Sequence, residues 1–247
     1  MTIIIDTSFK MYEDTPDGKD PDTYSRTLQN YHLLLWSKPL PSGKVFELSS
    51  DENPPYFLRH DSDIGQFLLS SDSILHTYSR WKRESMASII RTIPKSDIDA
   101  FFDLASTIGG YILFPANMVD GKPTINGIRG MHPRIKDRFD LTLECIRRWY
   151  TGEESPLYIH LDRYNYFFRL FDSFKGYCKF FLLDDLVNED MNEIRFWLPF
   201  QEFSTKSSVP VNRNEYLQYK ENVIAFTNAR SKRMVEYVNE KSSIPNQ

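Results

Sequence analysis

The amino-acid sequence predicts an α+β fold in which a small antiparallel sheet packs on a helix-rich C-terminal half. In the first half, short apolar segments are separated by turns rich in Gly, Pro and Asp, a pattern typical of antiparallel strands. After Pro133 the apolar residues recur every three or four positions, which is the period of helices that bury one face. The dipeptide Asp120-Gly121 favours a two-residue hairpin turn, so we expect a hairpin around it.

The whole chain, residues 1–247, is expected to form a single domain. Of the 247 residues, 40% are hydrophobic and 15% are aromatic, which is enough apolar material for a core. The sequence contains no internal repeat, no low-complexity tract and no linker long enough to divide it. Residues 6–30 are polar and include two prolines and a glycine, and we therefore expect residues 1–30 to form an extended N-terminal arm.

The segments around the expected hairpin are short. Prolines within 33–45 exclude a regular helix there and predict a rigid extended connection. Thr124-Ile125 follows the Asp120-Gly121 turn and is expected to lie on the return strand. The other short elements that we expect are strands at 45–48, 56–59 and 111–114 and helices at 63–70 and 96–106.

Longer helices are expected after Pro133. Their ranges are 137–150, 156–172, 177–187 and 213–239. In the last of them, Arg230 falls inside the apolar stripe. An arginine in such a position usually extends to the surface or pairs with a carboxylate, and Asp184 is the partner that we expect.

The charge balance argues against generic nucleic-acid binding. The formal net charge is −4 and the isoelectric point is about 5.8, whereas nucleic-acid-binding domains usually carry a basic excess. Cys145 and Cys178 lie in apolar helical sequence and are expected to be reduced and buried. The histidines lack metal-ligand spacing, so no metal site and no cofactor are expected. Without a visible signal peptide or membrane span, we expect a cytoplasmic protein.

The most informative charged residues lie in segment 132–150. The residues that share the face opposite the apolar stripe of the expected helix are Asp137, Asp140, Glu144, Arg147 and Arg148. Glu144 and Arg148 are an i, i+4 pair, and the simplest interpretation is structural ion pairing on an exposed face. Leu141 and Cys145 lie beside these charges, however, which favours a partly packed face that confines them to a cleft.

A glycine-rich turn precedes this helix. Arg129 stands between Gly127 and Gly130, which let a backbone approach a ligand closely, and its guanidinium can bind a phosphate or carboxylate. The structural alternative is that Arg129 of this turn pairs with Asp137 or Asp140. The functional interpretation requires the turn and the charged helix face to enclose one shared electropositive hollow.

The first functional hypothesis is a binding or regulatory module for a small anionic ligand, a nucleotide or an RNA end. In it, Arg129 and Arg138 bind the anion, and Arg148 is a third ligand-binding candidate. His132 serves as an auxiliary donor, and nearby aromatic side chains stack on a base.

The second hypothesis is a metal-independent phosphodiesterase or nuclease of a toxin or phage-defence type. His132 is then the candidate general acid or base, and Arg129 and Arg148 stabilise charge on the phosphoryl group. Asp140 and Glu144 orient these groups, or bind a divalent cation if they stand clear of the arginines. A third alternative is a scaffold that docks a partner protein.

Several long sequence strings carry a resemblance that runs over nearly the whole chain. The most specific are W-S-K-P-L-P-S-G at 36–43, T-I-N-G-I-R-G at 124–130 and D-R-F-D-L-T-L-E-C-I-R-R at 137–148. In these strings the chain resembles an uncharacterised bacterial family classed as a domain of unknown function. The resemblance implies no activity, and therefore no catalytic residues, for this chain.

Overall fold

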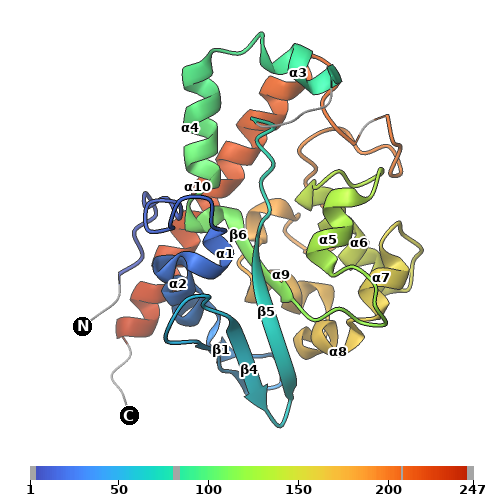
Figure 1. The fold of residues 1–247 in the computed structure, drawn as a ribbon. Helices are drawn as coiled ribbons and strands as arrows, with labels where there is room; N and C mark the ends of the chain where they lie inside the picture. Colours follow the sequence, from blue (N-terminus) through green and yellow to red (C-terminus); the bar gives the residue numbers. More distant parts are fainter. Residues whose placement is uncertain (1–3, 80–83, 207, 244–247) are drawn as a thin grey trace.

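The central sheet is antiparallel and has the strand order β3-β4-β5-β6. We describe it from a computed structural model, which describes residues 4–79, 84–206 and 208–243 (Figure 1). The strands are β3 (Ser49–Ser50), β4 (Leu58–Ser62), β5 (Gly65–Ser73) and β6 (Tyr111–Pro115). A separate two-stranded sheet joins β1 (Lys38–Pro39) to β2 (Val45–Phe46). The α+β class is thus confirmed, with the helices concentrated in the C-terminal half.

Strand β5 replaces the helix expected at 63–70. Its side chains alternate between the two faces of the sheet, and Phe67, Leu69 and Ser71 are the buried set. This period of two was present in the sequence, but the serines at its C-terminal end obscured it. The strand pairs with β4 from Ser62↔Gly65 to Leu58↔Leu69, and with β6 beyond that point.

The hairpin around Asp120-Gly121 is smaller than expected. Both turn residues have positive φ, 53° and 65°, as a two-residue turn of this kind requires, but a single bridge between Val119 and Lys122 closes it. The predicted return strand at Thr124-Ile125 is wrong. The Thr124 hydroxyl accepts a hydrogen bond from Gly127 N, which caps helix α5 (Ile125–Met131) and turns the chain into a helix instead.

The N-terminal segment is only partly an extended arm. It is irregular as far as Asp20, and then forms helices α1 (Pro21–Tyr24) and α2 (Arg26–Trp36). Ser25 caps α2 by accepting a hydrogen bond from Leu28 N, and α2 buries one face. The expectation of an arm up to residue 30, and of an extended connection before Ser37, therefore fails for the residues of α2.

The remaining helices surround the sheet, and α10 runs along most of the molecule behind it (Figure 1). Their bounds are α3 Glu84–Ile90, α4 Lys95–Ala105, α6 Phe139–Thr151, α7 Tyr158–Asp162, α8 Asn165–Phe168, α9 Phe174–Phe180 and α10 Arg213–Ser243. Short 3-10 helices are η1 Ile108–Gly110, η2 Arg169–Phe171 and η3 Asp184–Leu186. The helix expected at 156–172 is thus divided into α7, α8 and η2. Within the described residues, no helix is both long enough and apolar enough to cross a membrane.

Arg230 of α10 connects three elements through backbone carbonyl groups. Its guanidinium is fully buried and donates to Gly109 O at 2.9 Å and Tyr111 O at 2.8 Å. It also donates to Phe181 O at 3.1 and 3.3 Å. The expected partner Asp184 instead binds Lys179, so that prediction is wrong. Burial lowers the pKa of Arg230 to about 9, because the carbonyl groups supply hydrogen bonds but no counter-charge.

The first turn of α6 contains a closed ion pair. Arg138 and Asp140 are both fully buried, and Arg138 Nε donates to Asp140 Oδ1 at 3.0 Å. The second carboxylate oxygen accepts from Arg138 Nη2 and from the backbone N–H of Trp197 at 3.0 Å. The pair therefore anchors the loop that precedes α10 to the start of α6.

Asp140→Asn is expected to lower the free energy of unfolding by about 3 kcal/mol, because it removes the carboxylate that faces a buried guanidinium. Denaturant unfolding followed by circular dichroism gives the value. The control is Asp99→Asn, which breaks an exposed pair with Lys95 and should cost less than about 1 kcal/mol. Equal losses in the two variants would contradict the assigned role of Asp140.

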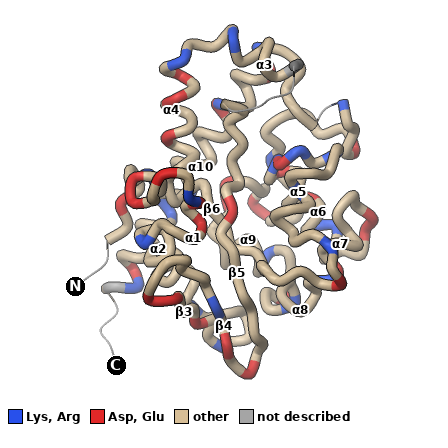
Figure 2. Tube along the Cα trace, in the orientation of Figure 1, with Lys and Arg blue, Asp and Glu red and all other residues tan. Residues whose placement is uncertain are grey.

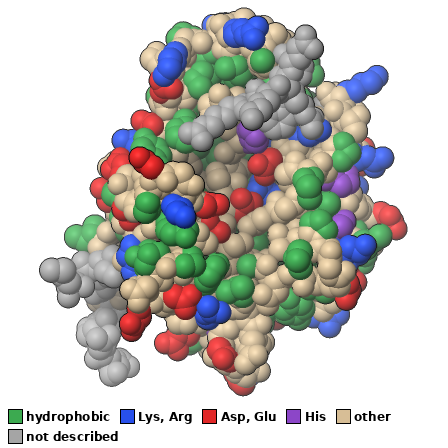
Figure 3. All heavy atoms as spheres, viewed as in Figure 1, with side chains coloured by type: hydrophobic (Ala, Val, Ile, Leu, Met, Phe, Trp, Pro, Cys, Tyr) green, Lys and Arg blue, Asp and Glu red, His purple; other side chains and the backbone are tan. Residues whose placement is uncertain are grey.

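Asp22 links α1 to β5 at Ser71, past Leu69, the last residue of β5 that pairs with β4. Its carboxylate accepts a hydrogen bond from Ser71 N at 2.6 Å. Acidic positions of α1 and β5 lie side by side in Figure 2, and acidic side chains gather in the hollow between α1 and α5 in Figure 3. Burial raises the pKa of Asp22 to about 8, and Asp20 and Asp72 add repulsion, while Ser71 N–H opposes the shift.

The stability of the protein is expected to fall as pH rises from about 4 to about 8, in part because of Asp22. In this window the folded state binds a proton at Asp22 that the unfolded state has released. Asp22→Asn keeps an acceptor for Ser71 N and cannot ionise. The free energy of unfolding of the variant, relative to that of the wild type, should therefore be about 2 kcal/mol higher at pH 8 than at pH 5. Unfolding curves at both pH values test this, and parallel changes in the two proteins would rule the assignment out.

Candidate functional site

The predicted site residues do not come together in one hollow. Arg129, on α5, is fully buried and binds Asp72 and Asp137 through Nη1, the latter at 2.9 Å. Its Nη2 donates to Asp137 O at 3.1 Å, and its Nε donates to Thr142 Oγ1 at 3.4 Å. The guanidinium is thus neutralised inside the protein. This is the structural alternative considered from the sequence, with Asp72 of β5 as an additional partner.

Two more of the predicted residues form the closed pair described above. Arg138 and Asp140 bind each other in the interior, and Asp140 also accepts from Trp197 N. Neither side chain reaches the surface of the protein. Their place in the structure is an anchor for a loop.

His132 lies at the C-terminal end of α5, where it is the C-cap residue. Its Nδ1 accepts a hydrogen bond from Arg134 N at 3.2 Å. Partial burial lowers the pKa of His132, and the positive charges of Arg134, His160 and Lys136 add to this effect. These effects favour the neutral imidazole, and His132 is not among the residues that line the cavity described next.

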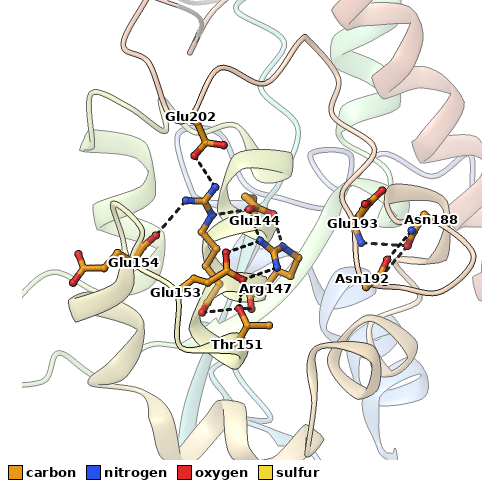
Figure 4. Close-up of polar contacts among 10 residues, drawn as sticks. Glu144, Arg147, Thr151, Glu153, Glu154, Asn188, Asn192, Glu193 and Glu202 are labelled. Atoms are coloured by element: carbon orange, nitrogen blue, oxygen red, sulfur yellow. Dashed lines mark hydrogen bonds and ion pairs between the residues drawn. The ribbon is translucent and has the colours of Figure 1, made fainter.

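The last two predicted residues, Glu144 and Arg148, line a cavity of about 620 Å³. Figure 4 shows how the charged side chains of α6 point into this space between α6 and the loop that precedes α10. The cavity is lined by Glu144, Arg147, Arg148, Glu153, Asn192, Glu193, Ile194, Phe196, Phe200 and Glu202. We call this space the α6 cleft.

Glu144 orients two arginines at once. Its side chain is only 5% exposed, and it accepts from Arg147 Nε at 2.8 Å and Arg147 Nη2 at 2.9 Å. It also accepts from Arg148 Nε at 2.7 Å. Helical spacing of i, i+3 and i, i+4 places both guanidinium groups over the same carboxylate. The two arginines are therefore held side by side, with their remaining N–H groups directed outward.

Exposed groups cover those outward N–H groups. Glu153, whose side chain is 48% exposed, accepts from Arg147 Nη1 at 3.1 Å. Glu202, 74% exposed, accepts from Arg148 Nη2 at 2.7 Å, and Glu154 O accepts from Arg148 Nη1 at 3.3 Å. Ion pairs with such exposed carboxylates contribute about 0–1 kcal/mol each, so they can be exchanged for another anion.

Aromatic rings form one wall of the cleft. Phe196 and Phe200 stack with ring centroids 4.3 Å apart and an interplanar angle of 5°. The Arg148 guanidinium lies 5.0 Å from the ring of Phe203 and 5.8 Å from that of Phe200. Glu202 and Phe203 both have positive φ, 47° and 57°, and this left-handed turn brings the Glu202 carboxylate to Arg148.

The charge of the cleft differs from the electropositive hollow that the sequence suggested. Its lining carries two arginines and four glutamates, and the ion pairs that the two arginines make within the described residues are all with glutamates. Among the residues that the structure describes, no group of three or more His, Cys, Asp or Glu side chains is arranged to hold a metal ion.

Sequence reasoning missed most of this wall. Arg147 was recognised on the helix face, but Glu202, Phe196 and Phe200 come from a loop about fifty residues further along. The loop has neither a helical nor a strand period, so no sequence signal placed it against α6. In the structure, a hydrogen bond from the backbone N–H of Trp197 to Asp140 holds this loop against α6.

Comparison with known proteins identifies the family of the chain. No curated protein and no solved structure is significantly similar to it. One family description matches almost the whole of the described fold, from the N-terminal segment to the middle of α10. The chain belongs to this family of unknown function, DUF6994, which matches residues 5–234.

Proposed function

We propose that the chain binds a small anionic ligand in the α6 cleft. One observation carries the proposal. Arg147 and Arg148 are fixed side by side by the buried Glu144, while exposed glutamates cover their outward N–H groups. Glu144 orients the two guanidinium groups, and the exposed carboxylates occupy the positions at which the oxygen atoms of an anionic ligand would bind.

Glu153 and Glu202 stand where the oxygen atoms of a ligand would bind. Glu202 is mostly exposed and Glu153 is nearly half exposed, so each side chain can turn into solvent when a ligand displaces it. A phosphate group carries more charge than one carboxylate and can bind both guanidinium groups together. One phosphate group can therefore replace both glutamates and keep both guanidinium groups paired, whereas a monocarboxylate exchanges one weak pair for another.

The phenylalanine wall favours a ligand that also has a planar group. Phe196 and Phe200 line the cleft and are partly exposed, and the cavity of about 620 Å³ has room for a mononucleotide. Stacking of a base on an exposed ring contributes about 1–3 kcal/mol. Within the class of anionic ligands, a nucleotide or an RNA end thus fits this cleft better than inorganic phosphate.

A phosphodiesterase function is less well supported than binding. That hypothesis gave His132 the role of general acid or base, and His132 lies at the end of α5. The cleft lining contains carboxylates and arginines, and Glu144 is engaged by both arginines. Binding is therefore the function that we carry forward.

Binding of ADP is expected to depend on Arg148. Titration calorimetry at low ionic strength should give saturable heat with ADP, and Arg148→Gln should weaken the affinity by about tenfold or more, because a charge-assisted hydrogen bond to phosphate is lost. Arg59→Gln, which breaks an exposed pair with Asp51 on β4, is the matched control and should bind like the wild type. Absence of saturable heat with ADP and AMP, or equal binding by Arg148→Gln, would overturn the proposal.

Removal of the internal competitor should strengthen binding. Glu202→Gln is expected to raise the affinity for ADP roughly two- to fivefold, because the ligand no longer has to displace an ion pair at Arg148. Glu240→Gln makes the same change of net charge on an exposed part of α10 and serves as the control. An equal gain in both variants would indicate a general charge effect, and a loss in Glu202→Gln would mean that Glu202 assists binding.

A further inference from the structure

A buried lysine lines a second cavity. Lys38 of β1 is 7% exposed, and it lines a space of about 350 Å³. The walls of this space are mainly apolar, formed by Pro39, Leu40, Pro41, Phe180 and Tyr237. Lys38 belongs to the W-S-K-P-L-P-S-G string, which the α6 cleft does not use.

Three aromatic rings surround the Lys38 amine. Its Nζ lies 4.9 Å from the ring centroid of Trp36, 4.7 Å from that of Phe180 and 4.6 Å from that of Tyr237. Within residues 4–79, 84–206 and 208–243, no hydrogen bond or ion pair links Lys38 Nζ to a carboxylate or carbonyl group. A lysine residue that is only 7% exposed and lines a cavity without such a partner is unusual.

The charged groups around Lys38 come from three elements. Arg230 and Lys241 lie on α10, Asp184 lies on η3, and Lys179 of α9 is bound to Asp184. Burial, together with the nearby charges of Arg230 and Lys241, lowers the pKa of Lys38 to about 7, and Asp184 opposes this shift. The ring faces favour the ammonium form, but each contributes only about 0.5–2 kcal/mol. Burial in an apolar site and two neighbouring cations therefore favour the uncharged amine, and the ring faces act against them.

We propose that Lys38 is a reactive amine that captures a small apolar aldehyde or ketone as a reversible imine in this cavity. The nitrogen lone pair attacks the carbonyl carbon, and an amine proton moves to the carbonyl oxygen to give a carbinolamine. Loss of that oxygen as water, with the second amine proton, leaves the C=N bond. Addition of water reverses each step, so no oxidant or reductant is needed.

The chemistry of the walls selects this class of ligand. An aromatic cage without a cation of its own would bind an external cation, but here the Lys38 nitrogen already occupies the space between the rings. The prolines, Leu40 and the rings offer apolar contacts to the substituent of a carbonyl compound. The inference is independent of the α6 cleft, because the two cavities share no lining residue.

Reductive trapping with benzaldehyde tests the proposal on the full chain. The protein is incubated with benzaldehyde and cyanoborohydride at pH 7, and the modified lysines are located by peptide mass spectrometry. Lys38 should be benzylated at least about tenfold faster than Lys175, an exposed lysine of α9, because its amine fraction at pH 7 is on the order of a thousandfold larger than that of an ordinary lysine. Modification of Lys38 no faster than Lys175 would overturn the proposal.

Two further measurements separate reactivity from mere accessibility. The rate at Lys38 should reach half of its maximum near pH 7. A rate at Lys38 that rises only in the range of ordinary lysines would contradict the proposal. Lys38→Met should remove the fast-reacting site, whereas Lys175→Met should leave it. If Lys38→Met does not fold, the pH profile of the unmodified chain still decides.

Discussion

The buried ion pair between Arg138 and Asp140 is the constraint on which the α6 cleft depends. Helix α6 carries the two arginines of the cleft, and the loop before α10 carries its aromatic wall. These segments are distant in sequence, and Asp140 joins them by accepting a hydrogen bond from Trp197 N. Because the carboxylate serves the guanidinium and the loop together, neither partner can leave without exposing an unsatisfied charge or N–H in the interior. The ion pair at the start of α6 thus fixes the position of the loop that carries the aromatic wall of the cleft.

Charged residues along α6 are sorted by depth. Asp140 in the first turn is fully buried, Glu144 one turn later is almost buried, and Arg147 and Arg148 reach the cleft. This gradient explains why residues of one helix face have different roles. Acids near the N-terminus and arginines near the C-terminus also suit the helix dipole, so the arrangement stabilises the helix while it presents two cations at its end.

Much of the fold could be predicted from the sequence, but only part of the site. Long periodic segments such as α6 and α10 were located to within a few residues, because the apolar stripe directly reports the buried face. The pairing of Glu144 with Arg148 followed from helical spacing. For Arg129 the pairing with Asp137 was considered, but the burial of Arg129 and Arg138 and the additional partner Asp72 were not expected, since a buried guanidinium and a ligand-binding one look alike in sequence. What distinguishes them is a carboxylate at the right depth, and for Arg129 one of these comes from β5, more than fifty residues away.

Arg230 is stabilised in a different way from the other buried arginines, and this difference affects Lys38. Carboxylates face Arg129 and Arg138, whereas Arg230 is bound by backbone carbonyl dipoles at Gly109, Tyr111 and Phe181. Its positive charge therefore still acts on its surroundings, and Lys38 is one of the groups that it acts on. Two cations in one apolar region repel each other, and one of them can relieve the repulsion by releasing a proton. A guanidinium holds its proton far more strongly than a primary amine does, so Lys38 is the group that releases it. The structural role of Arg230 in joining α10 to the sheet thus creates the conditions for a reactive amine beside it.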